Sequence, residues 1–461
     1  MTKCLAPIAA AAAIACCAAA LRAQQPPPVR QIGPILAVSH DTLASVSAAV
    51  QVAGGRVYVN DITAHRVLLY DSTLGSGRVI VDSGGSAADA YGTMPGTLLP
   101  YHRDSALLVT PASLAMLVLS PEGTIVRVLA MPPSGTRGLP SLIGNIFGTP
   151  GFDAAGRLAY FSPVRMTFRG PPDPSAGMSF QPPDSALIVR FDFAARTVDT
   201  VGAIRIPRTS MSVSRDDQGR MHMSMTALPL ATVDDWAVTS DGRIAIVRGR
   251  DYHVDWLGAD GAWSSTPRVQ FAWEQLDDAR KQVLIDSAAT AMQAAIDSML
   301  ARTQRSNAAG APGAGGAMIE GRQAAPGSSG GGTMIITVAP PAGGGGPPGP
   351  GAGGGGRPTG PTSVSMATPT ILKAALADVP DYRPAFRQGA VRADAEGGLW
   401  IRTSAVADGR PVYDVVDGRG EVTARVQLPP FRTVAGFGPG VIYMAVQDSS
   451  GTAHLERARI R

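Results

Sequence analysis

Residues 247–256 gather side chains that bind charged ligands. This stretch, VRGRDYHVDW, contains two arginines, two aspartates, a tyrosine and a histidine. Arginine beside tyrosine suits a carboxylate or a phosphate, because the guanidinium fork donates two parallel hydrogen bonds to such a group. The alternative is that arginine and aspartate pair within one hairpin and only support the structure. The candidate ligand-binding residues here are Arg248, Arg250, Asp251, Tyr252 and His253.

A second candidate group lies where a predicted strand ends. Asn60, Asp61 and His65 offer oxygen and imidazole groups to a cation or a polar ligand, because a β-turn brings residues a few positions apart close together. The alternative is that the asparagine and the aspartate only cap a turn. Arg165 and Arg169, in a long connection further along the chain, complete the set of candidate ligand-binding residues.

Known catalytic and cofactor motifs are missing from the sequence. Residues 351–356, GAGGGG, fit the dinucleotide pattern G-x-G-x-x-G, but no strand precedes them and no helix follows, so the match is spurious. There is no HExxH, P-loop or G-x-S-x-G motif, and none of the six histidines is spaced to share a helix face. We therefore assign no catalytic residue and no metal ligand, and predict no cofactor.

The elements that must position the candidates follow a repeated pattern. A short apolar strand, a turn with glycine or aspartate and a second strand of β-branched and aromatic residues recur along the chain. Four antiparallel strands recurring every ~40 to 55 residues are typical of a propeller blade, whereas a β-sandwich rarely repeats one hairpin so often. The sequence therefore predicts an all-β fold, a six-bladed β-propeller, with seven blades as the alternative. The six copies are residues 52–59, 103–109, 152–160, 238–247, 393–401 and 438–444.

Two details bear on the blade count and on how the ring closes. Residues 217–223 resemble a seventh copy, but their turn glycine lies only 23 residues before that of the copy at 238–247. Because this is too close for a four-stranded unit, we interpret the segment as a hairpin excursion from the third blade. The last copy ends one strand short, so the N-terminal strand near residues 34–39 is expected to complete the last blade.

One insertion, residues 272–383, interrupts the repeats. It separates blades 1–4, predicted at residues 24–271, from blades 5–6 at residues 384–461. Residues 273–305 have apolar side chains at helical spacing and no glycine or proline, which predicts a helix whose first apolar row includes Ala279 and Val283. Residues 306–370 are predicted to be disordered, because the 20 glycines and 8 prolines at 310–360 leave too little apolar surface to bury.

The N-terminus has the composition of a secretory signal. Residues 1–23 run from a basic start through an alanine-rich apolar stretch to Ala23, which predicts cleavage there and a periplasmic or secreted protein. A lipid anchor at Cys16 is the alternative. All three cysteines lie in this segment, so the mature chain is expected to have no disulfide and no thiolate chemistry. No other apolar stretch is long enough to span a membrane.

Charge argues against nucleic acid as a partner. The chain has 40 Lys and Arg against 36 Asp and Glu, without a long basic run, so the electrostatic footprint of a nucleic-acid-binding protein is missing.

Within a propeller, the short glycine and aspartate turns mark one face. The opposite face collects the long connections, among them residues 61–65, 162–185, 249–251 and the inserted helix, and such loops normally carry function.

The repeated hairpin resembles the six-bladed β-propellers of the NHL-repeat and TolB-like type. The resemblance depends on residues 156–160, 241–247 and 396–401 and covers about 34–271 and 384–461. Enzymes among such propellers hold calcium or zinc at the ring centre through Glu, Asn, Asp or His from several blades. Those ligand motifs cannot be matched here, so no catalytic residue is carried over.

Three hypotheses follow from the sequence. The first is an exported, non-catalytic propeller that binds a protein, a peptide or a small ligand on its loop-rich face. The second is a metal-dependent hydrolase or lyase with calcium or zinc in the central channel, where Asp61 and His253 are possible ligands. The third is a structural component of the cell envelope that has no specific ligand.

Overall fold

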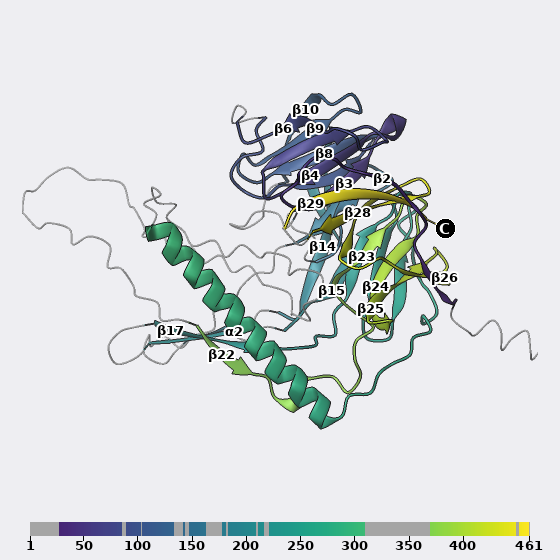
Figure 1. Ribbon diagram of the computed structural model, residues 1–461. Coiled ribbons are helices and arrows are strands. Elements are labelled where there is room, and N and C mark those ends of the chain that lie inside the picture. Colours follow the sequence, from purple (N-terminus) through teal and green to yellow (C-terminus); the bar gives the residue numbers. More distant parts are fainter. Residues whose placement is uncertain are drawn as a thin grey trace, which may run out of the picture.

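The chain forms a six-bladed β-propeller of four-stranded antiparallel sheets (Figure 1). The computed structural model describes residues 27–84, 89–102, 104–132, 142, 147–162, 178–180, 183–208, 211–215, 221–308, 369–448 and 451–460. The predicted signal segment and most of the glycine- and proline-rich stretch lie outside these ranges.

Each blade is listed from its first strand to its last. Blade 1 has β3 (Val46–Gln51), β4 (Val57–Asp61), β5 (Arg66–Tyr70) and β6 (Arg78–Val81). Blade 2 has β7 (Thr97–Tyr101), β8 (Ser105–Thr110), β9 (Ala115–Leu119) and β10 (Ile125–Ala130). Blade 3 has β11 (Gly151–Phe152), β12 (Leu158–Phe161), β14 (Ser185–Asp192) and β15 (Thr197–Arg205).

The remaining blades follow the same order. Blade 4 has β18 (Asp235–Val238), β19 (Ile244–Arg248), β20 (His253–Leu257) and β21 (Trp263–Ser265). Blade 5 has β23 (Phe386–Ala393), β24 (Leu399–Ala407), β25 (Arg410–Val416) and β26 (Val422–Gln427). Blade 6 has β27 (Arg432–Gly438), β28 (Val441–Gln447), β29 (Ala453–Arg459) and, from the other end of the chain, β2 (Ile35–Val38).

The ring closes through the N-terminal strand, as the sequence predicts. Strand β2 pairs antiparallel with β29 and supplies the fourth strand of blade 6. Just before it, β1 (Val29–Gln31) adds to blade 5 by pairing parallel with β26. Because the two ends of the chain meet in one sheet, the ring seam has no free strand edge.

The repeated turn is built by aspartate and glycine together. In blade 3 the Asp153 carboxylate accepts the backbone N–H of Ala155 at 3.1 Å and of Arg157 at 2.9 Å. Gly156 in this turn has φ +80°, a left-handed conformation that costs glycine little. Blade 5 repeats the geometry with Asp394 and Gly397, where φ is +85°. The D-x-x-G pattern thus specifies the turn that joins the first two strands of a blade.

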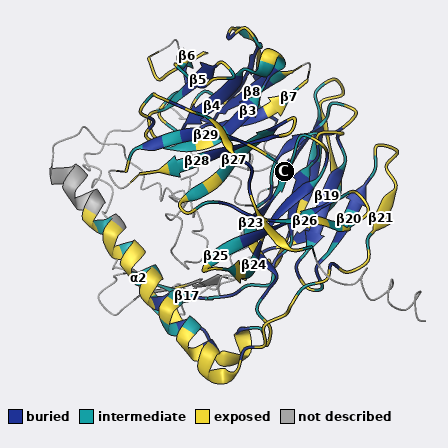
Figure 2. Cartoon of the chain, turned by 45° about the vertical axis from the view of Figure 1, so that its right-hand side comes forward, coloured by how far each residue is buried: buried dark blue, intermediate teal, exposed yellow. Residues whose placement is uncertain are grey.

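The core lies between the blades. Six clusters of buried side chains fill the six interfaces between neighbouring blades, and one of them joins Tyr443 of blade 6 to Tyr70 of blade 1. Because side chains alternate along a strand, each sheet presents apolar residues to both neighbours. Figure 2 shows the blade strands mostly dark blue, while the helix outside the ring is mostly yellow. Packing between blades, without disulfides, holds the ring.

Three connections on one face build a further sheet outside the ring. It consists of β13 (Met178–Phe180), β16 (Met211–Arg215), β17 (Met221–Ala227) and β22 (Thr370–Lys373). Strands β16 and β17 pair antiparallel on either side of residues 216–220, which lie outside the described ranges, and they belong to this outer sheet, so the blade count stays at six. The parallel pairing of β17 with β22 and the participation of β13 were not predicted.

Helix α2 (Asp278–Ala308) packs beside β17 and β22 (Figure 1). It begins five residues later than the predicted residue 273, because Asp277 caps it by accepting the N–H of Arg280 at 2.8 Å. Residues 274–276 instead bond to residues 381–383 in extended form, through Leu276 N–H to Asp381 O and Arg383 N–H to Glu274 O. A short 3-10 turn, η3 (Leu376–Asp378), follows β22, and another, η1 (Ala53–Gly55), lies in blade 1.

The helix buries a different face from the predicted one. Val283, in the predicted apolar row, is 65% exposed, whereas Lys281, Ile285 and Ala289 are buried. The Lys281 ammonium group reaches Asp381 at 2.6 Å while its stem is covered, so a charged residue lies on the buried face. Ile285 packs with Ala374 and Val379, which fixes α2 on the residues that follow β22.

The first strands of neighbouring blades approach closely at the ring axis. The fully buried Asp235 in β18 accepts the N–H of Val391 in β23 at 2.9 Å. The Thr149 hydroxyl, just before β11, donates to the Val391 carbonyl at 3.2 Å. Burial raises the pKa of Asp235 to about 6, although the Val391 N–H and the Arg392 charge oppose this shift.

This carboxyl predicts a pH dependence of stability. Its pKa is higher in the folded state than the ordinary value of 3.8, so the folded chain binds the extra proton between about pH 4 and 6. The free energy of unfolding should therefore fall by about 2–3 kcal/mol as pH rises through that window. Urea unfolding from pH 4 to 8 measures this, and Asp235→Asn should flatten the decline. An equal decline in both proteins would contradict the assignment.

Candidate functional site

Asn60 is fully buried, and its amide bonds to the protein itself. Its Nδ2 donates to Ser47 Oγ and to the Gly96 carbonyl, both at 2.9 Å, while its Oδ1 accepts the Tyr91 hydroxyl at 2.8 Å. The His65 ring stacks on Tyr91 with centroids 5.6 Å apart. His65 itself adopts φ +50°, the left-handed position of the turn. These two candidates lie together in blade 1, but the amide has no free donor or acceptor directed at solvent.

Asp61 serves as an anchor for the connection between blade 6 and blade 1. It is fully buried and accepts the backbone N–H of Ala44 at 3.1 Å and of Ser45 at 2.9 Å. Arg66 adds an ion pair at 3.0 Å from its Nη2. The bonds of Asn60 and Asp61 match the turn-capping alternative, and a ligand role for them stays a prediction. Arg165 and Arg169 lie outside the described residues.

The segment at residues 247–256 folds as the β19–β20 hairpin of blade 4, and it contributes to one polar network. Arg248 donates from Nε to Asp255 at 2.7 Å, and from Nη1 to Asp234 at 2.9 Å and the Ala203 carbonyl at 2.8 Å. Asp234 in turn accepts the N–H of Gly249 at 3.1 Å. The guanidinium group is thereby held in one orientation by two blades.

His253 extends this network between two carboxylates. Its Nδ1 lies 2.7 Å from Asp251 and its Nε2 lies 3.2 Å from Asp255. Asp251 also faces Arg268 at 3.6 Å. The structure thus brings three sequence candidates, Arg248, Asp251 and His253, into one chain of polar contacts.

The other two candidates in the hairpin lie apart from the network. Tyr252 is fully buried between blades 4 and 5, and its hydroxyl donates to Asp414 at 2.9 Å. Burial, and then the Asp414 charge, raise the pKa of Tyr252 well above its ordinary value. Arg250 is exposed at the turn. Tyr252 therefore supports the blade interface, and a ligand role for it stays a prediction.

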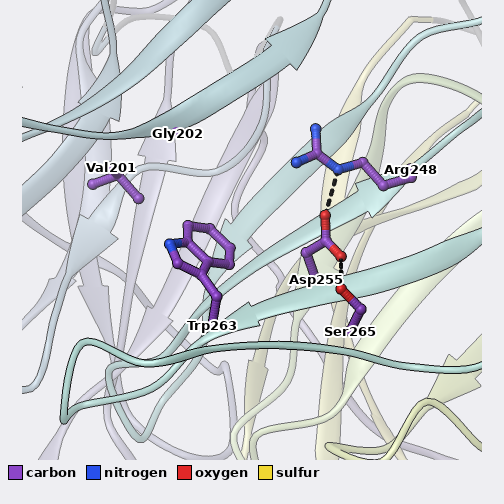
Figure 3. A pocket seen from close by; sticks show the side chains of 6 residues that line it. All are labelled: Val201, Gly202, Arg248, Asp255, Trp263 and Ser265. Carbon is purple, nitrogen blue, oxygen red and sulfur yellow. Dashed lines mark hydrogen bonds and ion pairs between the residues drawn. The ribbon is translucent and has the colours of Figure 1, made fainter.

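A pocket of about 280 Å³ lies beside the network (Figure 3). It is bounded by β15 of blade 3 and by β19, β20 and β21 of blade 4, so it opens at the rim of the ring and not in the central channel. Trp263 is 46% exposed there. In Figure 3 the Asp255 carboxylate bonds to both Arg248 and Ser265, the latter at 2.5 Å. The lining residues are Val201, Gly202, Arg248, Asp255, Trp263 and Ser265.

The carboxyl group in the pocket is ionised and fully engaged. Burial acts to raise the pKa of Asp255, but the Ser265 hydroxyl and the Arg248 guanidinium outweigh it, and the pKa is lowered. Its two oxygens accept hydrogen bonds from Arg248 and Ser265, and Nε2 of His253 lies 3.2 Å away. An acceptor this occupied and this acidic is poorly suited to proton transfer near neutral pH.

Three residues of the pocket network were missed by sequence reasoning. Asp234 and Ser265 lie outside the 247–256 segment, and Trp263 begins a separate strand after the turn at residues 258–262. The available signals were weak: an aspartate pair at the start of β18 and a lone tryptophan in the last strand of blade 4. All three belong to blade 4, and the pairing of Asp235 with Val247 and of Asp255 with Ser265 in its sheet brings them to Arg248.

The described part of the chain contains neither a group of metal ligands nor a membrane-spanning helix. Within those ranges no three His, Cys, Asp or Glu side chains are grouped as metal ligands would be. No helix in the same ranges is long and apolar enough to cross a membrane. A metal ion in the central channel stays a prediction.

Known proteins resemble this chain only distantly. No protein-family model matches the chain, and no curated protein matches it in sequence. Among solved structures, virginiamycin B lyase from Staphylococcus aureus is similar at 8% identity and TM-score 0.32, covering 91% of this chain and 96% of the lyase. The calcium-binding protein regucalcin from Agrobacterium tumefaciens is similar at 11% and 0.30, covering 94% and 98%. A luciferin-regenerating enzyme is similar at 9% and 0.31, covering 91% and 92%.

Such low identities and scores say nothing about the activity of this chain. The six-bladed architecture is established by its own strand order. The narrower resemblance to NHL-repeat and TolB-like propellers stays a prediction.

Proposed function

We propose that this chain is an exported β-propeller that binds a protein, a peptide or a small ligand without converting it chemically. The observation that carries the proposal is the rim pocket, where a half-exposed Trp263 lies beside the fixed polar groups of Arg248, Asp255 and Ser265. Pockets that bind ligands commonly combine aromatic surface with a few well-placed polar groups. Tryptophan and arginine also dominate binding energy at protein interfaces.

Preorganisation of Arg248 supports binding in particular. Two carboxylates and a backbone carbonyl hold its Nε and Nη1, and within the described residues its Nη2 donates to nothing. A ligand acceptor can therefore use this nitrogen without first ordering the side chain, which lowers the entropic cost of association. The ligand we expect carries an acceptor group next to a flat apolar part that covers the indole.

Variants at Trp263 and Gly202 test the pocket. A methyl group at Gly202 would lie 3.4 Å from Ile246 Cδ1 and 3.5 Å from Trp263 Cζ2, so Gly202→Ala fills space without forcing the strands apart. The probes are N-acetylated tripeptides and monosaccharides, screened by thermal shift and then titrated by calorimetry. Trp263→Ala should weaken the best probe about tenfold or more, and Gly202→Ala should weaken it in the same direction.

Trp273 provides the matched control for this experiment. It is 37% exposed and packs on Phe271, away from the pocket lining. Trp273→Ala should leave the affinity unchanged. If no probe binds the wild-type protein, or if binding survives the loss of Trp263, the pocket is not the ligand site. Export is tested separately, by mass spectrometry of the N-terminus of the protein in cell fractions, with Gln24 expected first.

A further inference from the structure

A second group of arginines lies on the face of blade 5 that is turned towards blade 6. In the β-sheet register, Arg392 lies opposite Trp400 and Arg402 lies opposite Tyr413. Both aromatic residues belong to the apolar cluster that blade 5 shares with blade 6. Because residues directly opposite each other in a sheet share a face, both arginines are on the blade 6 side.

Arg387 joins the same face. It follows Phe386, whose ring packs towards blade 4, so alternation along the strand directs Arg387 the other way. Desolvation, and then the like charges of Arg383 and Arg402, lower the pKa of Arg387. The guanidinium groups of Arg383, Arg387 and Arg402 therefore lie near one another at the start of β23.

The strand that carries two of these arginines is irregular at this point. The pairing of β23 with β24 shifts between Phe386 and Val391, and Gly389 in the shifted stretch has φ +73°. A bulge of this kind re-aims side chains and is over-represented next to functional sites. Here it separates Arg387, which is exposed, from Arg392, which turns towards the ring axis.

Among the described residues, Arg392 donates its hydrogen bonds to neutral groups. Its Nη1 donates to the Val391 carbonyl at 2.9 Å, the Gly389 carbonyl at 3.2 Å and the Thr149 hydroxyl at 3.4 Å. The acidic group that influences it is Asp235, whose carboxylate is occupied by backbone N–H groups. Arg392 thus faces the axis without a carboxylate in contact.

These arginines lack the counter-ions that others on the ring have. Four other arginines of the ring each form an ion pair with an aspartate or glutamate at 2.7 to 3.1 Å. They are Arg66, Arg157, Arg425 and Arg432. Within the described ranges, by contrast, no carboxylate lies within 4.0 Å of Arg387, Arg392 or Arg402. Only Arg383 beside them is paired, with Glu274 at 2.6 Å. The cluster therefore carries unbalanced positive charge, which repels itself unless an anion is present.

We propose that Arg387, Arg392 and Arg402 form a binding site for a small multivalent oxyanion, with phosphate or carboxylate groups, on the inner part of blade 5. Guanidinium groups suit both chemistries, because their planar forks match paired oxygens. Two of the three side chains are exposed, so a ligand reaches them directly. The site is separate from the rim pocket between blades 3 and 4, and the proposal does not depend on that pocket.

The test uses the full mature chain with pyrophosphate and with citrate as probes. Calorimetry and thermal unfolding are measured at constant ionic strength, with potassium chloride as the reference salt. We expect saturable binding of at least one probe and a rise in melting temperature, because an anion bound only by the folded state stabilises it by mass action. Pyrophosphate binding alone indicates a phosphate ligand, and citrate binding alone a carboxylate ligand.

Two double variants decide whether the cluster is responsible. Arg387→Gln with Arg402→Gln should weaken the preferred probe about 10- to 100-fold, since two charge-assisted contacts are lost. Arg127→Gln with Arg196→Gln removes two exposed arginines elsewhere and should leave affinity unchanged. Without a probe, the cluster variant should melt no lower than the wild-type protein, because like charges have been removed.

Several results would overturn the proposal. These are no saturable binding of either probe to the wild-type protein, an equal loss of affinity in both double variants, or unfolding of the cluster variant without a probe. The conservative Arg402→Lys variant adds a further check. It keeps the charge but loses the fork, so affinity between that of wild type and that of the double variant is expected, and wild-type affinity would contradict recognition by the fork.

Discussion

Replacing Asp61 by alanine should lower the free energy of unfolding by about 2–4 kcal/mol. The carboxylate is fully buried and accepts N–H groups of Ala44 and Ser45 as well as two nitrogens of Arg66. Its removal leaves two backbone donors and a guanidinium group without their acceptor in a place that water reaches poorly. A chain with a stability of ordinary size would lose a large part of it.

The position of Asp61 in the ring makes this loss global. Residues 42–45 lead from β2, which closes blade 6, into β3 of blade 1, and Leu43 among them is fully buried against blade 6. Freeing this connection loosens the packing of residues 42–45 between blades 6 and 1. Guanidinium unfolding followed by far-UV circular dichroism measures the change.

Asp71 gives the control for this prediction. It is also a turn aspartate of blade 1, but it is exposed and bonds mainly to Thr73. Asp71→Ala should therefore lower the free energy of unfolding far less than Asp61→Ala, because water replaces the lost contacts of an exposed carboxylate. Equal losses in the two variants would show that Asp61 acts only as a local turn residue.

The sequence predicts the ring because its signals are local. A D-x-x-G turn fixes its own backbone through an aspartate such as Asp153 and a left-handed glycine such as Gly156, independent of the rest of the fold. Repetition of that turn gives the blade count, and a missing last strand indicates closure. Both predictions are confirmed by the strand order.

The outer sheet and the helix face could not be predicted in the same way. Strands β17 and β22 are separated by more than a hundred residues, and no local pattern states that Ser224 pairs with Thr370. The buried face of α2 includes Lys281, which a hydrophobic pattern excludes, because its partner Asp381 lies beyond the glycine-rich stretch. Pairings of this range depend on tertiary structure.

The residues of the candidate site also differ in whether local sequence predicts them. Arg248, Asp251 and His253 were predicted together because one hairpin holds them. Trp263 enters only when β21 pairs with β20, and Val201 only when blade 3 packs on blade 4. For the arginines of blade 5, alternation fixes the face that each side chain takes. Which of them lacks a counter-ion depends on every neighbouring element, and the sequence does not show it.

Substituting alanine for Gly436 should destabilise the ring by about 3 kcal/mol or more, at the upper end of the range for overpacking. A Cβ at this position in β27 would lie 1.9 Å from the carbonyl oxygen of Ala49 in β3. The obstacle is backbone and not a flexible side chain, so the first strands of blades 6 and 1 must move apart. A closed ring cannot take up that movement at one seam without disturbing the packing of Tyr443 against blade 1.

Gly75→Ala is the control, because its Cβ would meet only the Thr73 hydroxyl at 3.4 Å. Thermal unfolding of both variants should show a large drop in melting temperature for Gly436→Ala alone, and a drop of equal size in the control would refute close contact at the seam.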